Sequence, residues 1–288
     1  MKRIAVSILR NRGYRLVRTE REPKHDDELY RLFPRESLEA RKFYNIGAGL
    51  FYHKYWTNID YESEHYSRIQ NHPFINFNLM DLSPLPIADS SAEIVYSSHT
   101  IEHISDEAAS NLFKESWRIL KPGGVIRITT PDSWLAMEAY KRNDVNFFYW
   151  VERYSRNGSW EHLYKMPLSK ASIHQLFLHR FASQLCEIDI DDSPTKKYSD
   201  SEIIDLFETN PDESILSFFT SKCKYNSDHP GNHINWWTRR KAISMLKNSG
   251  FDNPYVSGWG QSLLAPLRNT DLFDKTHPKI SLYIEAIK

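Results

Sequence analysis

Two glycines separated by one residue follow a short apolar run early in the chain. Residues 43–49 read Phe-Tyr-Asn-Ile-Gly-Ala-Gly. Glycine adopts backbone conformations that other residues avoid, and it lets the main chain come close to a ligand. The pattern therefore predicts a strand that turns sharply beneath a bound molecule. In open α/β sheets, ligands bind at such carboxyl ends of strands.

A second short strand is predicted over residues 56–60, and it ends in Asp60. A carboxylate there can accept hydrogen bonds from both hydroxyls of a ribose, which predicts a cofactor that contains a nucleoside. A nicotinamide dinucleotide is the first alternative. However, Tyr52 stands at the third glycine position of its fingerprint, and Asp60 follows Gly49 sooner than the roughly 20-residue spacing expected there. The short spacing also leaves little room for a full crossover helix.

The remaining signals alternate between strands and helices, as in a parallel α/β sheet. Ser105 and Thr238 are predicted to cap helices, and Gly250 is predicted to end the second of these helices in a left-handed conformation. The predicted elements, in order, are an extended segment (74–79), a strand (92–98), a helix (105–120), a Pro-Gly-Gly stop (122–124), a strand (125–130), a helix after residue 238, and two last strands (254–259 and 280–287).

In this order the segments resemble the class I S-adenosylmethionine-dependent methyltransferases, especially the methyltransferase type 11-like group that is similar to enzymes of bacterial surface-polysaccharide pathways. The resemblance covers about residues 43–132 and the C-terminal segment, and it includes Ile-Glu-His at 101–103 and Leu-Lys-Pro-Gly-Gly at 120–124. It implies an α/β fold with a Rossmann-like, mostly parallel seven-stranded sheet and an antiparallel last strand. It also implies S-adenosyl-L-methionine as cofactor and S-adenosyl-L-homocysteine as product. The cofactor-binding residues that it implies are Asn45, Gly47, Ala48, Gly49, Asp60, Tyr61, Asp81, Leu82, Ser97 and Ser98.

The stretch between the predicted core strands is longer than a minimal methyltransferase fold needs. We expect an N-terminal basic helical segment (1–42), a cofactor-binding domain (43–132 and 238–288) and an inserted, mainly helical cap that binds the acceptor (133–237). Helical signals occur at residues 172–187, and aromatic residues gather between 147 and 160. Aromatic faces could stack on a sugar ring, although large rings are more often buried for packing.

Histidines supply the candidates for acid–base chemistry. His99 is predicted to act as a general base, because a sugar hydroxyl is a poor nucleophile while it keeps its proton. His229 and His233 precede the last helix and are further catalytic candidates. His99, Glu102 and His103 share one face if a helix begins there, so they are also candidate ligands of a transition metal. The default prediction is a hydrogen-bonded pair of Glu102 and His103 without a metal.

Composition limits the classes of partner. The formal net charge is zero, which argues against a surface that follows nucleic acid. Cys186 and Cys223 lack metal-ligand spacing, and we expect reduced thiols in a reducing compartment. No apolar run approaches the length of a membrane span. Residues 2–24 are basic, and either peripheral contact with an anionic membrane or packing on the domain would explain them. We expect a cytoplasmic protein, with the inner membrane surface as an alternative location. A homodimer is left open.

The sequence therefore predicts a methyltransferase that O-methylates a sugar or glycan intermediate in surface-polysaccharide biosynthesis. Three alternatives stay open. They are an N-methyltransferase of an amino sugar or small amine, an NAD-dependent nucleotide-sugar enzyme, and a cofactor-binding partner subunit without catalysis. The acceptor, the atom that is methylated and the oligomeric state do not follow from the sequence.

Overall fold

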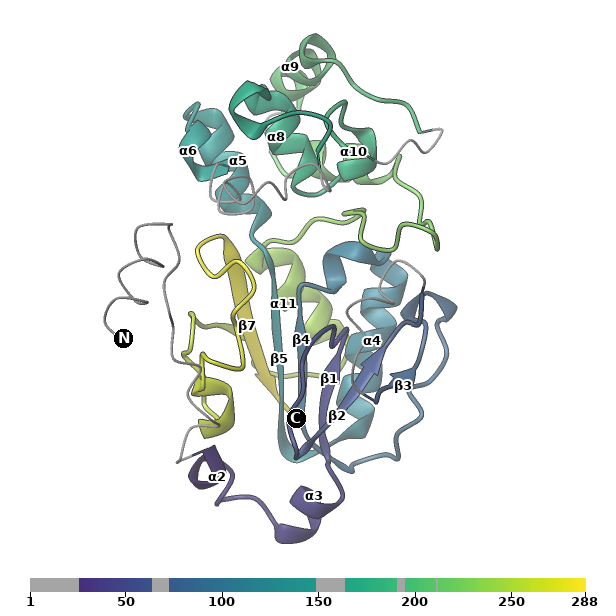
Figure 1. Cartoon of the computed structure of the whole chain (residues 1–288), viewed down its shortest axis with the longest axis vertical. Coiled ribbons are helices and arrows are strands. Elements are labelled where there is room, and N and C mark those ends of the chain that lie inside the picture. Colours follow the sequence, from purple (N-terminus) through teal and green to yellow (C-terminus); the bar gives the residue numbers. More distant parts are fainter. Residues whose placement is uncertain (1–25, 64–72, 149–163, 191–194, 211) are drawn as a thin grey trace, which may run out of the picture.

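The computed structural model describes residues 26–63, 73–148, 164–190, 195–210 and 212–288 (Figure 1). The basic segment 2–24 lies outside the described residues, so the predicted helix and its contact with a membrane stay predictions. The same holds for the aromatic residues of segment 149–163.

A seven-stranded sheet forms the centre of the structure, in the order β3-β2-β1-β4-β5-β7-β6. The first five strands run parallel, and β7 pairs antiparallel with both β5 and β6. This arrangement confirms the predicted Rossmann-like sheet with an antiparallel last strand. The bounds are β1 Phe43–Ile46, β2 Trp56–Asp60, β3 Ile75–Asn76, β4 Ala92–Ser98, β5 Leu120–Pro131, β6 Tyr255–Val256 and β7 Ser281–Ile287.

One boundary differs from the prediction. Strand β5 already begins at Leu120, so the Pro122-Gly123-Gly124 stop lies inside the strand rather than before it. The register against β4 shifts at the start of this pairing, between Ala92 and Ile94. A shift of register accommodates Pro122, which cannot donate to a regular ladder.

The described residues 47–55 between β1 and β2 contain no helix, as the short spacing predicted. On the face of the sheet that a crossover helix after β1 would cover, a cluster of aromatic residues packs instead. Trp56 from β2 lies 4.9 Å, between ring centroids, from Phe273, and its Nε1 donates a hydrogen bond of 2.6 Å to the Tyr30 hydroxyl. Helices α2 (Asp26–Leu29) and α3 (Arg35–Glu39) and the 3-10 turn η7 (Ala265–Arg268) surround the cluster. The N- and C-terminal parts of the chain thus replace the missing crossover helix.

The opposite face packs against α4 (Asp106–Ile119) and α11 (Arg239–Asn248). Both predicted caps are confirmed, because Ser105 accepts a hydrogen bond from the Ala108 N–H and Thr238 accepts one from the Lys241 N–H. Gly250 has a φ of +109° and ends α11 in the left-handed half of conformational space, as predicted.

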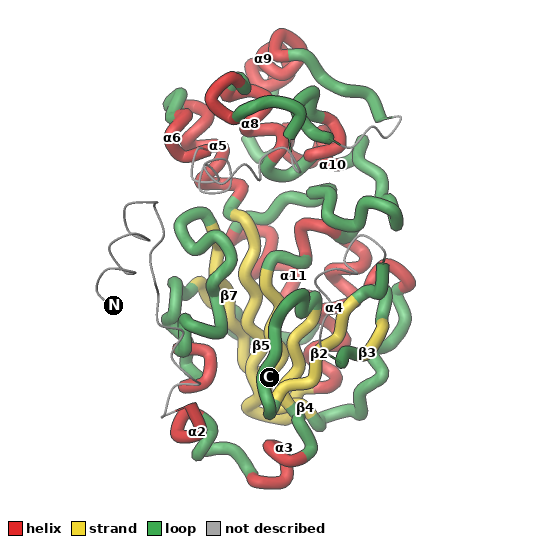
Figure 2. The backbone as a smooth tube through the Cα atoms, viewed as in Figure 1, coloured by secondary structure: helices red, strands yellow, loops and turns green. Residues whose placement is uncertain are grey.

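The segment after β5 forms a separate layer of short helices beyond the carboxyl ends of the parallel strands (Figure 2). These helices enclose a hydrophobic cluster of their own, which includes Phe177, Leu185 and Phe219. The predicted helix over 172–187 is shorter, because α8 ends at His179. The elements are α5 Ser133–Lys141, α6 Val145–Phe148, η5 Leu168–Lys170, α8 Ile173–His179, η6 Ser183–Leu185, α9 Asp200–Thr209 and α10 Ser214–Thr220.

The cysteines and the lengths of the helices bear on the predicted class of protein. Cys186 and Cys223 are both free. Within the described residues, every helix falls short of the length and apolar character that a bilayer crossing requires.

Candidate functional site

A cavity of about 620 Å³ lies at the carboxyl ends of β1, β2 and β4. Small-molecule sites usually measure about 300–1,000 Å³, so the cavity has room for a ligand. It also lies where ligands bind in open α/β sheets. Its wall combines the turn after β1, the loop around η1 (Leu79–Asp81), the segment after β4, and parts of the segments before α11 and β7.

The two glycines of the turn are needed for different reasons. Gly47 has a φ of +70°, and a Cβ built on it would lie 2.1 Å from Thr100 Oγ1. Gly49 has a φ of +53°, but a Cβ there would meet nothing within 4 Å. Any side chain at Gly47 would therefore collide with the wall of the cavity, whereas Gly49 supplies backbone conformation alone.

Asp60 connects the end of β2 to this turn. Its Oδ2 accepts a hydrogen bond of 2.7 Å from the Gly49 N–H, and its Oδ1 accepts one of 2.8 Å from the Tyr61 N–H. Each carboxylate oxygen has two acceptor positions, so these bonds fix the carboxylate and still allow it to accept ligand hydroxyls. Asp60 lines the cavity, as a ribose-binding residue must.

Asn45 is a buried polar residue in the wall of the cavity. Its side chain is buried and lines the cavity beside the glycine turn, yet its Oδ1 has no hydrogen-bond partner among the described residues. A buried acceptor without a partner costs about 1–3 kcal/mol. The close approach of the backbone at Gly47 and the carboxylate of Asp60, which suits a ribose, show that the residues present fit S-adenosylmethionine.

Seven of the ten predicted cofactor residues line the cavity, namely Asn45, Gly47, Ala48, Gly49, Asp60, Tyr61 and Ser98. Three lie outside its lining. Ser97 precedes Ser98 on β4, is buried and is not among the lining residues. Asp81 and Leu82 are exposed at the end of η1, where Asn78 caps the turn by accepting from the Met80 N–H. The turn leaves Asn78 and Met80 on the lining, and Asn78 Nδ2 donates a hydrogen bond of 2.9 Å to Asp81 Oδ1.

The lining also contains residues that the sequence did not suggest. Tyr225 and Pro230 come from the segment that returns from the inserted helices, and Lys275 and Thr276 come from the segment before β7. No local motif marks these positions, since each is brought to the cavity by contacts with residues far away in the sequence.

Arg127 holds the segment before β7 in place. Its guanidinium is fully buried and makes two hydrogen bonds to Asp274, of 3.0 and 2.5 Å, and one of 2.8 Å to Glu285. Although burial opposes the charged form, Asp274 and then Glu285 raise the pKa of Arg127. Asp274 directly precedes Lys275, so this buried network positions that part of the cavity wall.

His99, the predicted general base, lines the cavity at the end of β4 and has a φ of +51°. This uncommon conformation turns the chain after the strand. Its Nε2 shares a hydrogen bond of 2.7 Å with the Ser281 hydroxyl, and its Nδ1 lies 3.1 Å from Glu102 Oε1. Both ring nitrogens are thus engaged by protein groups, so in this arrangement neither is available to an acceptor. The role of His99 as a base stays a prediction.

Glu102 lies in η2 (Ile101–His103) and is 1% exposed. Its Oε2 accepts a hydrogen bond of 3.1 Å from the Thr130 hydroxyl, whereas its Oε1, 3.1 Å from His99 Nδ1, makes no well-aligned hydrogen bond within the described part of the chain. Although burial alone would raise it, the neighbouring His99 lowers the pKa of the Glu102 carboxyl to about 2. Glu102 is therefore an anion enclosed in protein.

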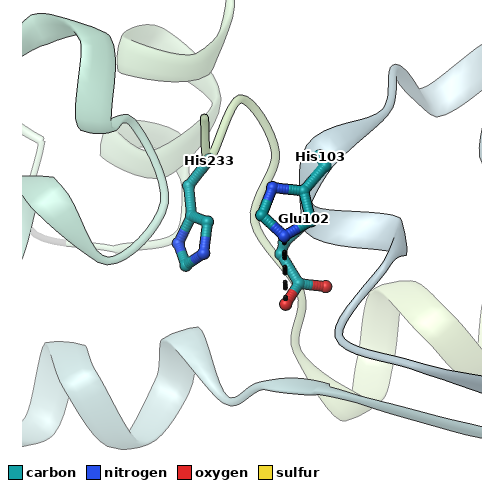
Figure 3. A group of neighbouring side chains, drawn as sticks. All are labelled: Glu102, His103 and His233. Carbon is teal, nitrogen blue, oxygen red and sulfur yellow. Dashed lines mark ion pairs between the residues drawn. The ribbon is translucent and has the colours of Figure 1, made fainter. Parts of the chain in front are cut away.

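Two histidines stand beside this carboxylate (Figure 3). One nitrogen from His103, one from His233 and one oxygen from Glu102 all lie within 4.8 Å of one another. Burial, and then the neighbouring His103, lowers the pKa of His233 to about 3, so its ring is neutral at pH 7. The structure thus joins Glu102 and His103 of the predicted group to His233, which is 130 residues further along the chain.

His229 and His233 are outside the cavity lining, although both were predicted as catalytic candidates. His229 is exposed. His233 faces the inserted helices, because its Nδ1 donates a hydrogen bond of 2.8 Å to the Arg180 carbonyl. Of Glu102, His103 and His233, only His103 lines the cavity. The sequence had predicted His103 as a structural or metal-binding residue.

Comparison with known proteins identifies the central part of the chain. Residues 46–128 match the family described as "Methyltransferase domain". A probable S-adenosylmethionine-dependent methyltransferase of Mycolicibacterium smegmatis is 31% identical over 75 residues, which are 26% of this chain and 28% of that protein. The chain thus matches little more than a quarter of the length of this curated relative.

Two solved structures have a related outline. A methyltransferase from Mesorhizobium loti gives a TM-score of 0.40 at 13% identity, covering 93% of this chain and 99% of that one. Another from Archaeoglobus fulgidus gives a TM-score of 0.37 at 12% identity, covering 91% and 92%. The methyltransferase domain is therefore identified by the family match over residues 46–128 and by the strand order of the sheet, and not by these two structures.

Proposed function

Because the chain carries a class I S-adenosylmethionine-dependent methyltransferase domain, we propose that it transfers the methyl group of S-adenosylmethionine to a hydroxyl of a sugar or glycan intermediate in surface-polysaccharide assembly. The observation that carries the proposal is the composition of the cavity wall. The glycine turn and Asp60 form one side, and Tyr225 and Pro230 of the inserted segment form another. A donor bound by the first side would face an acceptor that enters beneath the second.

The chain's own residues have three tasks in such a reaction. S-adenosylmethionine, when bound, supplies an electrophilic methyl group whose bond to sulfur breaks as the bond to the acceptor oxygen forms. Gly47 and Asp60 hold the donor, and the segments that carry Tyr225 and Lys275 orient the acceptor and exclude water from the cavity. Correct alignment and exclusion of water account for most of the catalysis expected here. The hydroxyl must also lose its proton, and the engaged nitrogens of His99 leave that step without an assigned base.

The acceptor class is the least constrained part of the proposal. Aromatic residues of the wall, among them Phe51, Tyr61 and Tyr225, offer faces on which a sugar ring can stack, and Lys275 and Thr276 offer polar contacts. An amino sugar would suit the same wall, so N-methylation is the nearest alternative. The nicotinamide alternative has less support, because the β1–β2 connection is short and β7 is antiparallel.

Calorimetry with S-adenosylhomocysteine and with NADH tests the cofactor. We expect binding of S-adenosylhomocysteine and a loss of roughly tenfold or more in affinity for Asp60→Ala, which corresponds to about 1.4 kcal/mol. Asp252→Ala, which removes an exposed carboxylate outside the cavity, is the matched control. Binding of NADH without any response to S-adenosylhomocysteine would refute the assignment.

Transfer of a radioactive methyl group to a panel of nucleotide sugars, amino sugars and free monosaccharides tests the acceptor. Incorporation into a hydroxyl supports the proposal, whereas incorporation only into an amine supports the alternative. Binding of the cofactor with no turnover on any compound of the panel would favour the partner subunit without catalysis.

A further inference from the structure

We propose that Glu102, His103 and His233 bind a divalent transition-metal ion, at the point where the segment returning from the inserted helices meets the end of β4. The starting observation is that one nitrogen from each histidine and one oxygen of the carboxylate all lie within 4.8 Å of one another. Two imidazoles and one carboxylate form a ligand set that suits zinc, iron and related ions, and it leaves other positions of the ion open.

The hydrogen bonds of the two histidines orient them for this task. His103 Nδ1 lies 3.1 Å from the Asn232 carbonyl, and His233 Nδ1 lies 2.8 Å from the Arg180 carbonyl. A carbonyl oxygen can only accept, so Nδ1 carries the proton in both rings, and the lone pair of each neutral ring is on Nε2. Histidine ligands of metals commonly donate their second nitrogen to a carbonyl in this way.

The carboxylate is arranged in a complementary way. Thr130 donates to Glu102 Oε2, which leaves Oε1 directed toward the histidines. This atom is buried and makes no well-aligned hydrogen bond within the described residues, although it lies 3.1 Å from His99 Nδ1 and 3.9 Å from His103 Nε2. A buried anionic oxygen next to imidazole lone pairs is unfavourable unless a cation or proton lies between them. A metal ion on the side of His103 and His233 would supply this charge, while His99 Nδ1 faces the same oxygen from another side.

The backbone around the cluster is fixed. The N–H groups of Ile234 and Asn235 both donate to the Glu102 carbonyl, at 2.9 and 3.1 Å. The His233 N–H donates to Ser183 Oγ, which attaches the same loop to the inserted helices. Donor atoms of a tetrahedral zinc site stand roughly 3.4 Å apart, given bonds of about 2.1 Å. The donor atoms, now within 4.8 Å of one another, would therefore have to approach by up to about 1.4 Å on binding of the ion.

The ion would lie next to the cavity, because His103 lines it. An open coordination position on that side could take an acceptor hydroxyl and promote the loss of its proton to solvent. This consequence rests on the proposed function, but the binding of the ion does not.

Binding is tested on the full chain without a purification tag, stripped with a chelator and titrated with Zn²⁺ and with Co²⁺ in the absence of cofactor. We expect a single ion per chain and visible Co²⁺ absorption bands without a thiolate charge-transfer band, which would instead indicate Cys186 or Cys223. His233→Asn and His103→Asn should each weaken binding roughly a hundredfold or more. His229→Asn, an exposed histidine of the same segment, should bind like the parent.

Far-UV circular dichroism and binding of S-adenosylhomocysteine report whether the variants fold. His103→Asn is the second variant should His233→Asn not fold, because His103 is partly exposed. The proposal is overturned if the stripped parent takes up no ion above the blank, or if either folded histidine variant binds the ion as tightly as the parent. Since no step of this experiment measures methyl transfer, an inactive enzyme that binds the ion contradicts only the proposed function.

Discussion

Ser133 and Trp237 join the two ends of the inserted segment by a pair of hydrogen bonds. The Ser133 N–H donates to the Trp237 carbonyl at 2.9 Å, and the Trp237 N–H donates to Ser133 Oγ at 3.1 Å. The indole of Trp237 is fully buried, and its Nε1 donates to the Ile101 carbonyl at 3.0 Å. The entry and exit of the insertion are thus attached to each other and to η2.

Ser133→Ala should weaken this attachment. The buried Trp237 N–H would lose its acceptor, which costs about 1–3 kcal/mol in free energy of unfolding. Urea unfolding measures the loss, and hydrogen exchange of residues 225–237 should increase with it. Ser217→Ala, an exposed serine of α10, should change neither quantity. Equal stability of the Ser133 and Ser217 variants would show that these hydrogen bonds contribute little.

The two glycines of the turn should respond differently to alanine. Gly49→Ala carries only the strain of a left-handed backbone, about 1–2 kcal/mol. Gly47→Ala adds a Cβ 2.1 Å from Thr100 Oγ1, so it should destabilise the chain further and lower the affinity for S-adenosylhomocysteine roughly tenfold or more. Thermal unfolding and calorimetry on the two variants provide the comparison. Partial recovery of affinity in Gly47→Ala/Thr100→Ala would identify the contact as the cause.

Arg127→Met should be among the most damaging substitutions in the chain. It leaves Asp274 and Glu285, both fully buried, without their cation. Removal of one partner from a buried ion pair costs about 3–5 kcal/mol. Arg240→Met breaks an exposed ion pair with Glu213 and should cost about 1 kcal/mol or less. Guanidinium unfolding of both variants tests the contrast, and similar losses would contradict the role given to Arg127.

The inserted helices should become less stable in acid. Burial lowers the pKa of His179 to about 3, and its Nε2 is 3.7 Å from Asp189 Oδ2, too far for a hydrogen bond. The unfolded value is about 6.5, so between these pH values the unfolded chain binds more protons. The free energy of unfolding should therefore fall as the pH decreases from about 6.5 toward 3. His179→Phe removes the titrating group, and its unfolding midpoint should depend less on pH than that of the parent.

The sequence predicted correctly those features, helix caps and the glycine turn, that are determined by residues adjacent in the chain. Ser105 and Thr238 cap their helices because a cap needs only the next three residues. The turn at Gly47 follows from the absence of a Cβ. Local signals were less specific where two neighbouring residues had the same pattern. Ser97 and Ser98 both end β4, and of the two only Ser98 lines the cavity.

Asp81 and Leu82, which were predicted to bind the cofactor, also show that a local pattern does not fix the position of a side chain. The carboxylate of Asp81 suggested a ligand contact, but Asp81 is exposed at the end of a 3-10 turn capped by Asn78 and is not among the residues that line the cavity. Such a turn depends on one side-chain hydrogen bond, and the sequence pattern of an extended segment does not reveal it. The predicted general base is a second case, because His99 is engaged by Ser281, a residue on a strand 182 positions later.

The sequence by itself determined the class of the fold, the glycine turn and the place of Asp60, because these depend on backbone freedom and on periodicities within a few residues. Only the tertiary structure decided which side chains complete the cavity and which histidine joins Glu102. Lys275 reaches the cavity through the buried bonds of Arg127, and His233 reaches Glu102 through a loop attached on both sides. Such convergence depends on packing between distant segments, and no local pattern encodes it.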